Sequence, residues 1–308
     1  MKNFVLYSSK ETPHPITEDS FEEYTKSIFP FKQKIDGVNK YYATCPECEN
    51  PIQLKGLYND SSQRVYGAHT GKDVKGLNPY IHENYIYCPR SVQGTTVPKD
   101  QRKEIVREKD IAIYNTIREN FDLVVSYAKT HLGYYISEKN AKECLRTYYA
   151  SQGWLYPHST VNNIPFMIFY LQCGTNPYGL WIRKESELEK SILKCKDLQL
   201  ETLNDKAGKY YNRLVSASHE YMVLTMMLHM HKCKEDNDGT LRESINIQIS
   251  KDISKDTARH NWKDLVETKI DIPELEFVNF INSQKKYRNE NLIQFAKELM
   301  PPIFVDTV

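Results

Sequence analysis

In the first third of the chain, apolar residues occur in short runs with turn-forming residues between them. Residues 41–44 and 51–55 each predict a short strand, and a further strand is expected at 63–66. Residues 85–89 are expected to form one more strand or a knuckle. A helix is expected after Thr17, which can cap its first turn, because apolar residues then recur at helical spacing. The pattern predicts a small β-rich module over residues 1–98.

After residue 99, the apolar positions recur at steps of three and four residues, which is the spacing of an amphipathic helix. Gly133 is a typical residue for the end of such a helix, and Ser137 is a typical N-cap for the next one. The predicted helices cover residues 100–132, 137–151, 185–196 and 206–233, and the chain after a strand at 245–249 is expected to be largely helical.

One segment of this second region has a different pattern. Residues 165–173 are continuously apolar, and a loop rich in glycine and proline separates them from the apolar residues 180–182. This arrangement predicts a buried β-hairpin near residues 165–183.

The 308 residues are enough for two domains, and residues 91–99, which have no apolar periodicity, are the expected linker. We therefore predict one domain over residues 1–98 and a second over 99–308. The net charge of +1 gives no overall reason to expect nucleic acid or a membrane surface as a partner. No segment approaches the ~20 apolar residues of a membrane span and no export signal opens the chain, so no membrane partner is expected.

The seven cysteines supply the most specific chemistry. Their odd number and scattered positions favour a reducing environment, so a cytoplasmic location is expected. Cys45 and Cys48 are separated by two residues, and such a turn presents two thiolates to one Zn²⁺. Cys88 is the expected third ligand. His69 is the preferred fourth ligand because it directly follows a predicted strand, and His82 is the competing candidate.

This set of ligands favours a structural zinc ion. Four protein ligands leave no position for the water that a catalytic zinc ion activates. A redox role for Cys45 and Cys48 would require a helix that begins at the first cysteine, whereas residues 51–55 predict a strand. A deaminase would need a His-x-Glu motif before the cysteines, and this sequence has none there.

The order of Cys-Pro-x-Cys, short hairpin, aromatic residue and histidine resembles a zinc-ribbon or zinc-knuckle module over about residues 43–90. Over about residues 43–70 it is also similar to the N-terminal zinc module of CoiA-like bacterial proteins. The chain departs from that family because Tyr66-Gly67-Ala68-His69 replaces a longer aromatic-histidine signature. The family attaches a nuclease domain, whose acidic metal site we cannot place in this sequence.

A local excess of positive charge lies within and just after the predicted zinc module. Residues 55–109 contain ten lysines and arginines against six acidic residues, a net charge of +4, together with several tyrosines. Lysine and arginine contact phosphates and aromatic rings stack on bases, so this region is the expected nucleic-acid surface. The candidate contact residues are Arg64, Lys72, Lys75 and Arg90.

The expected fold class is α+β, with a small zinc-stabilised β-rich module followed by a mainly helical domain with a central β-hairpin. The first functional hypothesis is a non-catalytic, zinc-containing bacterial protein that binds DNA or RNA in regulation, in a mobile element or in phage defence. The alternative is an adaptor that binds a protein partner and in which zinc only stabilises the fold. A hydrolase or nuclease with a site around His158, Asn162 and Asn163 ranks third, because no mechanism can be drawn for it.

Overall fold

The computed structural model describes residues 1–9, 11–58, 64–91, 97–204, 206–218, 222–236, 239–254, 260–283 and 288–303. The chain forms two compact units. The first comprises Met1–Val97 and Lys232–Arg242, and the second comprises Pro98–His231 and Glu243–Val308. The predicted boundary lies after residue 98, and the first unit in addition takes in Lys232–Arg242. Helices and antiparallel sheets both occur among the described residues, so the predicted α+β class is confirmed.

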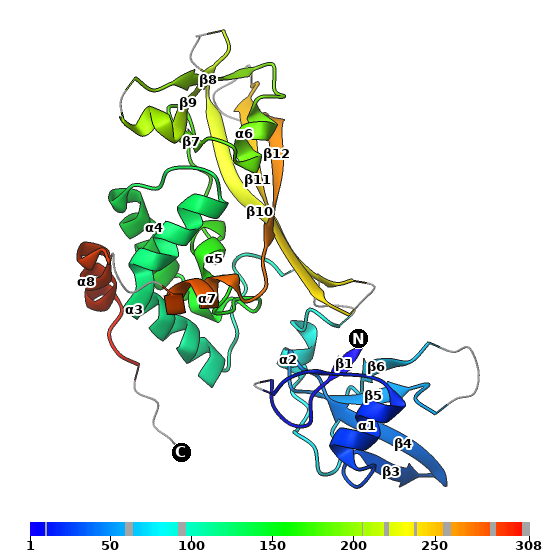
Figure 1. Cartoon of the computed structure of the whole chain (residues 1–308). Helices are drawn as coiled ribbons and strands as arrows, with labels where there is room; N and C mark the ends of the chain where they lie inside the picture. The colour runs from blue at the N-terminus through cyan, green and yellow to red at the C-terminus, as the bar shows by residue number, and fades with distance from the viewer. Residues whose placement is uncertain are drawn as a thin grey trace. The chain divides into compact units, whose positions relative to one another are not determined.

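A four-stranded antiparallel sheet with the strand order β3-β4-β5-β6 forms the centre of the first unit (Figure 1). Ile52 pairs with Ala43 on one side and with His69 on the other, so the register connects the ends of β4 and β6 through the start of β5. The elements of this unit are β1 (Asn3–Phe4), β2 (His14–Pro15), α1 (Glu18–Thr25), β3 (Lys32–Ile35), β4 (Val38–Thr44), β5 (Pro51–Lys55), β6 (Tyr66–His69) and α2 (His82–Ile86).

Local sequence signals explain most of these elements. Thr17 caps α1 as predicted, because its hydroxyl accepts a hydrogen bond from the backbone N–H of Ser20 at 3.2 Å. Phe21 of α1 is fully buried and meets the ring of Tyr41 edge-on. The strands predicted at 41–44 and 51–55 are confirmed within β4 and as β5.

Two predictions in this unit differ from the structure. The third strand was expected over 63–66, but β6 begins at Tyr66, and residue 63 lies outside the described residues. Residues 85–89 were expected to be a strand or knuckle, but α2 occupies His82–Ile86. Of the predicted linker 91–99, residues 92–96 lie outside the described residues.

Helices make up the first part of the second unit. Ser137 caps α4 as predicted, with its hydroxyl accepting from the Asn140 N–H at 3.2 Å. Arg288 donates two hydrogen bonds of 2.8 Å to the carboxylate of Asp122, which ties the start of α8 to α3. The helices are α3 (Glu108–His131), α4 (Glu138–Ala150), α5 (Ile164–Tyr170), α6 (Glu187–Ile192), α7 (Glu276–Ser283) and α8 (Glu290–Leu299), with short 3₁₀ turns at Gly153–Leu155 and Lys206–Lys209.

Two three-stranded antiparallel sheets follow, in the orders β7-β9-β8 and β10-β11-β12. In the second sheet, Ile245, Ile247 and Ile249 alternate on the buried face of β11. The strands are β7 (Trp181–Arg183), β8 (Leu198–Thr202), β9 (Tyr211–Ser216), β10 (Leu224–Glu235), β11 (Leu241–Asp252) and β12 (Trp262–Ile272). The tip of the hairpin formed by β10 and β11 belongs to the first unit.

The strand β10 changes its buried face near its middle. Leu224, Met226 and Leu228 are buried, whereas after Met230 the buried positions are His231 and Cys233. Met230 has a φ of 51°, and an irregular residue of this kind in a strand shifts the alternation by one position. This shift turns the side chain of His231 into the interior.

The hairpin predicted near 165–183 is wrong. Residues Ile164–Tyr170 form the helix α5, in which Pro165 occupies the first turn and every residue is buried. A continuous apolar run fits a fully buried helix as well as a strand, because neither has a polar face to reveal its period. Only Trp181–Arg183 is a strand, and it pairs with β9.

The predicted helix at 206–233 is also wrong, because this stretch contains a 3₁₀ turn, β9 and most of β10. The end of the chain was expected to be largely helical, but β12 spans Trp262–Ile272 before α7 and α8. The second unit is therefore mixed rather than mainly helical. Among the described residues, no helix has both the length and the apolar character needed to cross a membrane.

Candidate metal centre

The first two cysteines lie in the tight turn that joins β4 to β5. Thr44 and Pro51 are paired at the ends of these strands, and the turn between them starts at Cys45. The backbone N–H of Cys45 donates to the Asn50 carbonyl at 2.9 Å, and the N–H of Glu49 donates to the Cys45 carbonyl at 3.0 Å. These bonds fold the chain back on itself, so that Cys45 and Cys48 lie on the same side of the turn.

The other two candidate ligands come from separate parts of the unit. His69 is the last residue of β6, where the pairing with Ile52 brings it to the same end of the sheet as the turn. Cys88 follows α2, and its N–H donates to the Tyr85 carbonyl at 3.1 Å. The sheet register and the short helix therefore bring together residues that are far apart in the sequence.

The four side chains form one cluster that could hold a metal ion. The sulfur atoms of Cys45, Cys48 and Cys88 and a ring nitrogen of His69 all lie within 4.8 Å of one another. Cys45 Sγ lies 3.8 Å from Cys88 Sγ, and Cys48 Sγ lies 3.2 Å from His69 Nε2.

Two of the distances between ligand atoms are close to those of a tetrahedral zinc site. With Zn–S bonds of about 2.3 Å, two sulfur ligands of a regular tetrahedron lie about 3.8 Å apart. With a Zn–N bond of about 2.05 Å, a sulfur and a nitrogen ligand lie about 3.6 Å apart. The Cys45–Cys88 distance matches the first value, and the Cys48–His69 distance is slightly shorter than the second. Three sulfurs and one nitrogen are also the donor set that suits zinc.

The three cysteines of the cluster are buried, and His69 is half-buried. Burial opposes ionisation of Cys45, but hydrogen bonds from Cys48, Cys88 and His69 outweigh it and hold the pKa of Cys45 well below its usual value. The hydrogen bond to Cys45 raises the pKa of both Cys48 and Cys88. One thiolate stabilised by two neighbouring thiols is a site in which a cation replaces protons.

Residues that would not bind the metal themselves form hydrogen bonds that hold the turn and its surroundings in place. The fully buried side chain of Asn50 donates to the Ile81 carbonyl at 2.9 Å and accepts from the Ile81 N–H at 2.8 Å. Asn84 donates to the Cys48 carbonyl at 3.0 Å, and Tyr85 meets the ring of His69 edge-on. Neither asparagine was predicted from the sequence, because neither residue type nor spacing marks an amide that supports a metal ligand without contacting the metal.

His82, the competing fourth ligand, lies outside this cluster. It is exposed at the start of α2, and its Nδ1 is 3.2 Å from the hydroxyl of Tyr80. The four-residue cluster is complete without it, and it is the only group of this kind among the described residues.

Of the four residues predicted to contact nucleic acid, three are exposed and the fourth has a buried side chain. Arg64, Lys72 and Lys75 are exposed. The side chain of Arg90 is only 5% exposed and forms ion pairs with Glu47 at 3.3 Å and Glu235 at 2.8 Å. Its guanidinium is therefore already paired within the first unit. To bind a phosphate, Arg90 would have to give up its ion pairs with Glu47 and Glu235.

Part of the positive charge after the zinc module is also internal. Lys103 forms a buried ion pair with Asp110. Lys99 donates to the Leu228 carbonyl at 2.6 Å, and burial lowers its pKa. The local charge of +4 counted from the sequence thus overstates what this region offers to a ligand.

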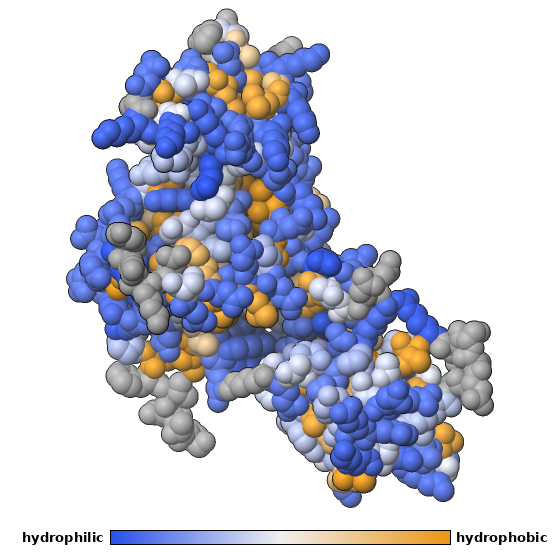
Figure 2. All heavy atoms as spheres, in the orientation of Figure 1, coloured by the Kyte–Doolittle hydropathy of each residue, from blue (hydrophilic) through white to orange (hydrophobic). Residues whose placement is uncertain are grey.

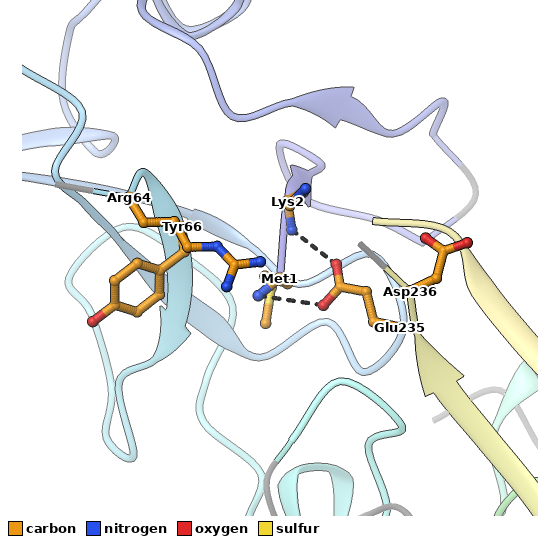
Figure 3. Close-up of a pocket in the computed structure, with 6 residues that line it drawn as sticks. All are labelled: Met1, Lys2, Arg64, Tyr66, Glu235 and Asp236. Atoms are coloured by element: carbon orange, nitrogen blue, oxygen red, sulfur yellow. Dashed lines mark hydrogen bonds and ion pairs between the residues drawn. The ribbon is translucent and has the colours of Figure 1, made fainter. Parts of the chain in front are cut away.

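The first unit has a pocket of about 350 Å³, lined in part by Arg64, one of the residues predicted to contact nucleic acid. Figure 3 shows Arg64 and Tyr66 on one side and the two acidic residues on the other. Glu235 accepts from the Lys2 backbone N–H at 2.9 Å, so its carboxylate already has partners. The pocket is lined by Met1, Lys2, Arg64, Tyr66, Glu235 and Asp236.

A buried polar cluster lies in the second unit, where the sequence suggested a catalytic site around His158, Asn162 and Asn163. Glu243 accepts hydrogen bonds of 2.6 Å from both His231 and Asn163. Asn163 also donates to the His158 carbonyl at 2.8 Å. His231 was not predicted to take part, because its place on the buried face depends on the irregular residue Met230 in β10.

Asn162 has a different role from its neighbour. Its amide donates to the Pro273 carbonyl at 2.6 Å and accepts from the Phe277 N–H at 3.1 Å, which joins the segment before α5 to the residues before α7 and to the first turn of α7. Both of these hydrogen bonds are structural.

Comparisons with protein-family models, with curated proteins and with solved structures found no match.

Proposed function

We propose that this chain is a non-catalytic zinc protein, in which one Zn²⁺ bound by Cys45, Cys48, His69 and Cys88 stabilises the first unit. The observation that supports this most directly is the set of four ligand atoms within 4.8 Å of one another, three of them on buried cysteines. A set closed by four protein ligands leaves no position for a reactive water, so the ion has a structural role. The ion would connect the β4–β5 turn, the end of β6 and the segment after α2.

We further propose that the first unit binds nucleic acid through the exposed cations Arg64, Lys72 and Lys75. Tyr66, two residues after Arg64 in the chain, is 40% exposed and offers a ring for stacking on a base. Figure 2 shows that most residues on the visible surface are hydrophilic, with apolar residues scattered among them. Arg90 is omitted from this surface because of its internal ion pairs.

Salt-dependent binding tests this part of the proposal. The zinc-loaded protein should bind single-stranded DNA or RNA, and the logarithm of affinity should fall with the logarithm of salt concentration by about 0.7 for each phosphate contacted. Replacing Arg64, Lys72 and Lys75 together by glutamate should abolish binding.

A matched control carries the same charge change elsewhere. Lys139, Lys194 and Lys196 are exposed residues of the second unit, and replacing all three by glutamate should leave binding unchanged. If the wild-type protein fails to bind any nucleic acid at low salt, the nucleic-acid function is refuted, whereas the zinc site stands or falls on metal analysis.

A protein partner is the second candidate, and a specific observation favours it. Ile28 and Phe29, which follow α1, are 60% and 55% exposed, and Tyr24 at the end of that helix is 42% exposed. Large apolar side chains exposed close together in the sequence are a common feature of protein contact sites. Recovery of one specific protein with the wild-type chain, and its loss on changing Ile28 and Phe29 to serine, would favour this function.

A further inference from the structure

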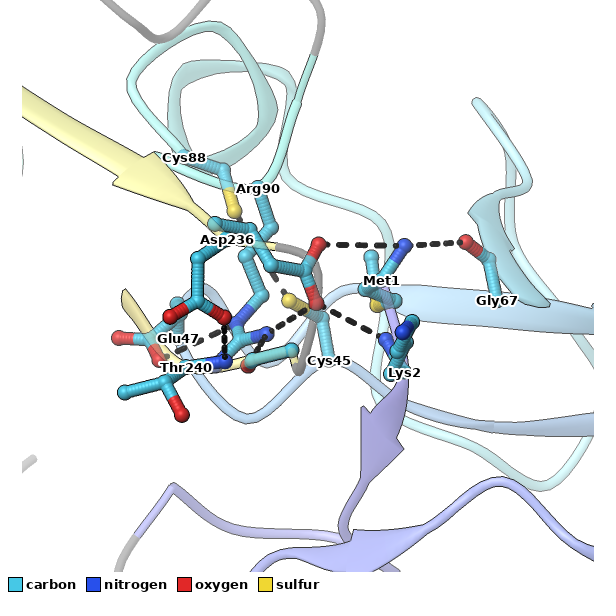
Figure 4. Close-up of polar contacts among 11 residues, drawn as sticks. Met1, Lys2, Cys45, Glu47, Gly67, Cys88, Arg90, Asp236 and Thr240 are labelled. Atoms are coloured by element: carbon cyan, nitrogen blue, oxygen red, sulfur yellow. Dashed lines mark hydrogen bonds and ion pairs between the residues drawn. The ribbon is translucent and has the colours of Figure 1, made fainter. Parts of the chain in front are cut away.

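The tip of the β10–β11 hairpin is tightly attached to the first unit beside the metal cluster. Arg90 Nη1 donates to Glu235 Oε1 at 2.8 Å and to the Gly239 carbonyl at 3.1 Å (Figure 4). One guanidinium therefore holds both the end of β10 and the turn that follows it. The side chain of Arg90 is 5% exposed and that of Glu235 is 18% exposed, so this ion pair is largely removed from solvent.

Arg90 is also linked to the residues that would bind the metal. It lies two positions after Cys88 in the chain, and its Nε donates to Glu47, which stands between Cys45 and Cys48. Figure 4 draws Arg90 and Glu47 together with Cys45 and Cys88, whose sulfur atoms are in contact. The same side chain thus contacts the metal-binding turn on one side and the hairpin tip on the other.

The turn of the hairpin makes a second close contact. Gly239 has a φ of 85°, and a Cβ atom added to it would lie 2.7 Å from the Cβ of Lys2. The Lys2 backbone N–H also donates to Glu235 at 2.9 Å. Lys2 precedes β1, and Val5 just after this strand pairs with Thr44, the residue before Cys45. The hairpin is therefore connected by two routes to residues that neighbour the cluster in the chain.

Electrostatics favour the same coupling. Three thiolates and one neutral imidazole around Zn²⁺ leave a net charge of −1 on the centre. Arg90, two positions after Cys88 in the chain, carries a charge of the opposite sign. Groups that support ligands from the second sphere change metal affinity by about 10- to 100-fold.

We propose that the hairpin tip, Lys232–Arg242, is a clamp whose docking strengthens metal binding at the cysteine–histidine cluster, and whose release weakens it. By thermodynamic reciprocity, metal binding strengthens docking by the same factor. The strands β10 and β11 continue from this tip into the second unit, so the metal state is linked to a segment that both units share. This inference rests on the proposed zinc site and names its regulation.

Chelator competition with the full-length protein tests the clamp. Glu235→Gln removes the negative charge with which Arg90 forms an ion pair in the hairpin. Glu235 is not a metal ligand, but the dissociation constant for zinc should still rise about tenfold. Gly239→Ala should have a similar effect, because the added methyl group displaces the turn from Lys2. Arg242→Gln is the matched control, since Arg242 is in the same hairpin, is 74% exposed and pairs with Asp236 within the tip.

Hydrogen exchange gives an independent readout on the same proteins. Peptides covering 232–242 should exchange faster in Glu235→Gln with zinc bound, while circular dichroism remains that of the wild type. If these peptides loosen in the variant but its zinc affinity equals that of the wild type, the clamp is refuted while the zinc site stands. If the wild-type protein binds no zinc at all, the proposed function itself fails.

Discussion

Cys45 Sγ lies 3.8 Å from Cys88 Sγ, although 43 positions separate the two residues in the chain. Nothing covalent holds them there, because all seven cysteines are free thiols. If the three buried cysteines were ionised, their thiolates would repel one another. A divalent cation bound between them offsets this repulsion. Metal binding and folding of the first unit should therefore be strongly coupled.

Substitution of one ligand tests this coupling. Purified wild-type protein should contain about one zinc ion per chain, and Cys48→Ser should lose it. Because zinc binding in small modules contributes on the order of 10 kcal/mol to folding, residues 41–90 should lose protection from hydrogen exchange in this variant. Metal analysis by mass spectrometry and exchange measurements check the two effects. Cys173→Ser is the control, because Cys173 is exposed and lies outside the cluster.

The identity of the fourth ligand can be tested with two histidine variants. His69→Ala should weaken zinc binding strongly, because it removes the only nitrogen ligand of the cluster. His82→Ala should retain one zinc ion at wild-type affinity, because His82 lies outside the cluster, is exposed and is hydrogen-bonded to Tyr80. Equal losses in the two variants would contradict the assignment of His69, and loss only in His82→Ala would reverse it.

The ion pair between Lys103 and Asp110 should be important for stability. Asp110 is fully buried and also accepts a hydrogen bond from the Arg107 N–H at 3.0 Å at the start of α3. Asp110→Ala would leave the buried Lys103 without its partner, so the free energy of unfolding should fall by about 3–5 kcal/mol. Glu143→Ala breaks an exposed ion pair with Arg146 and should cost less than about 1 kcal/mol. Denaturant titration measures both, and equal effects would show that the buried pair is unimportant.

The carboxylate of Glu243 should be required for packing in the second unit. Its removal in Glu243→Ala would leave the buried His231 and Asn163 without their acceptor, and we expect a loss of about 3 kcal/mol in stability. Glu267→Ala is a suitable comparison on the neighbouring strand, because this side chain is 55% exposed. Its loss should cost less than about 1 kcal/mol. A stable, well-folded Glu243→Ala protein would contradict the structural role given to this cluster.

Amphipathic elements with capping residues were predictable from the sequence. The helix after Ser137 and the strand at 51–55 agree with the structure, because their side-chain spacing and end residues depend only on neighbours in the chain. The helix predicted over 100–132 is present as α3 but begins at Glu108. The position where a helix starts is less certain, because several residues in such a region can serve as the cap.

The failures share one cause. Residues 164–170 and 224–235 contain residues that suit helices and strands about equally in a buried setting, and the neighbours that decide between them are distant in sequence. Methionine and leucine in β10 are good helix formers, but pairing with β11 places them in a sheet. The irregular residue Met230 then changes which side chains are buried, which no simple period reveals.

The sequence by itself determined that Cys45 and Cys48 form a metal-type turn, because the spacing of two residues acts through local geometry alone. It also placed His69 and Cys88 among the candidates. Only the tertiary structure decided that these four lie together while His82 lies apart, since that depends on the register of β5 with β6 and on α2. It also decided that Arg90 holds the tip of a distant hairpin rather than facing solvent, because a long-range ion pair has no signature in the order of residues.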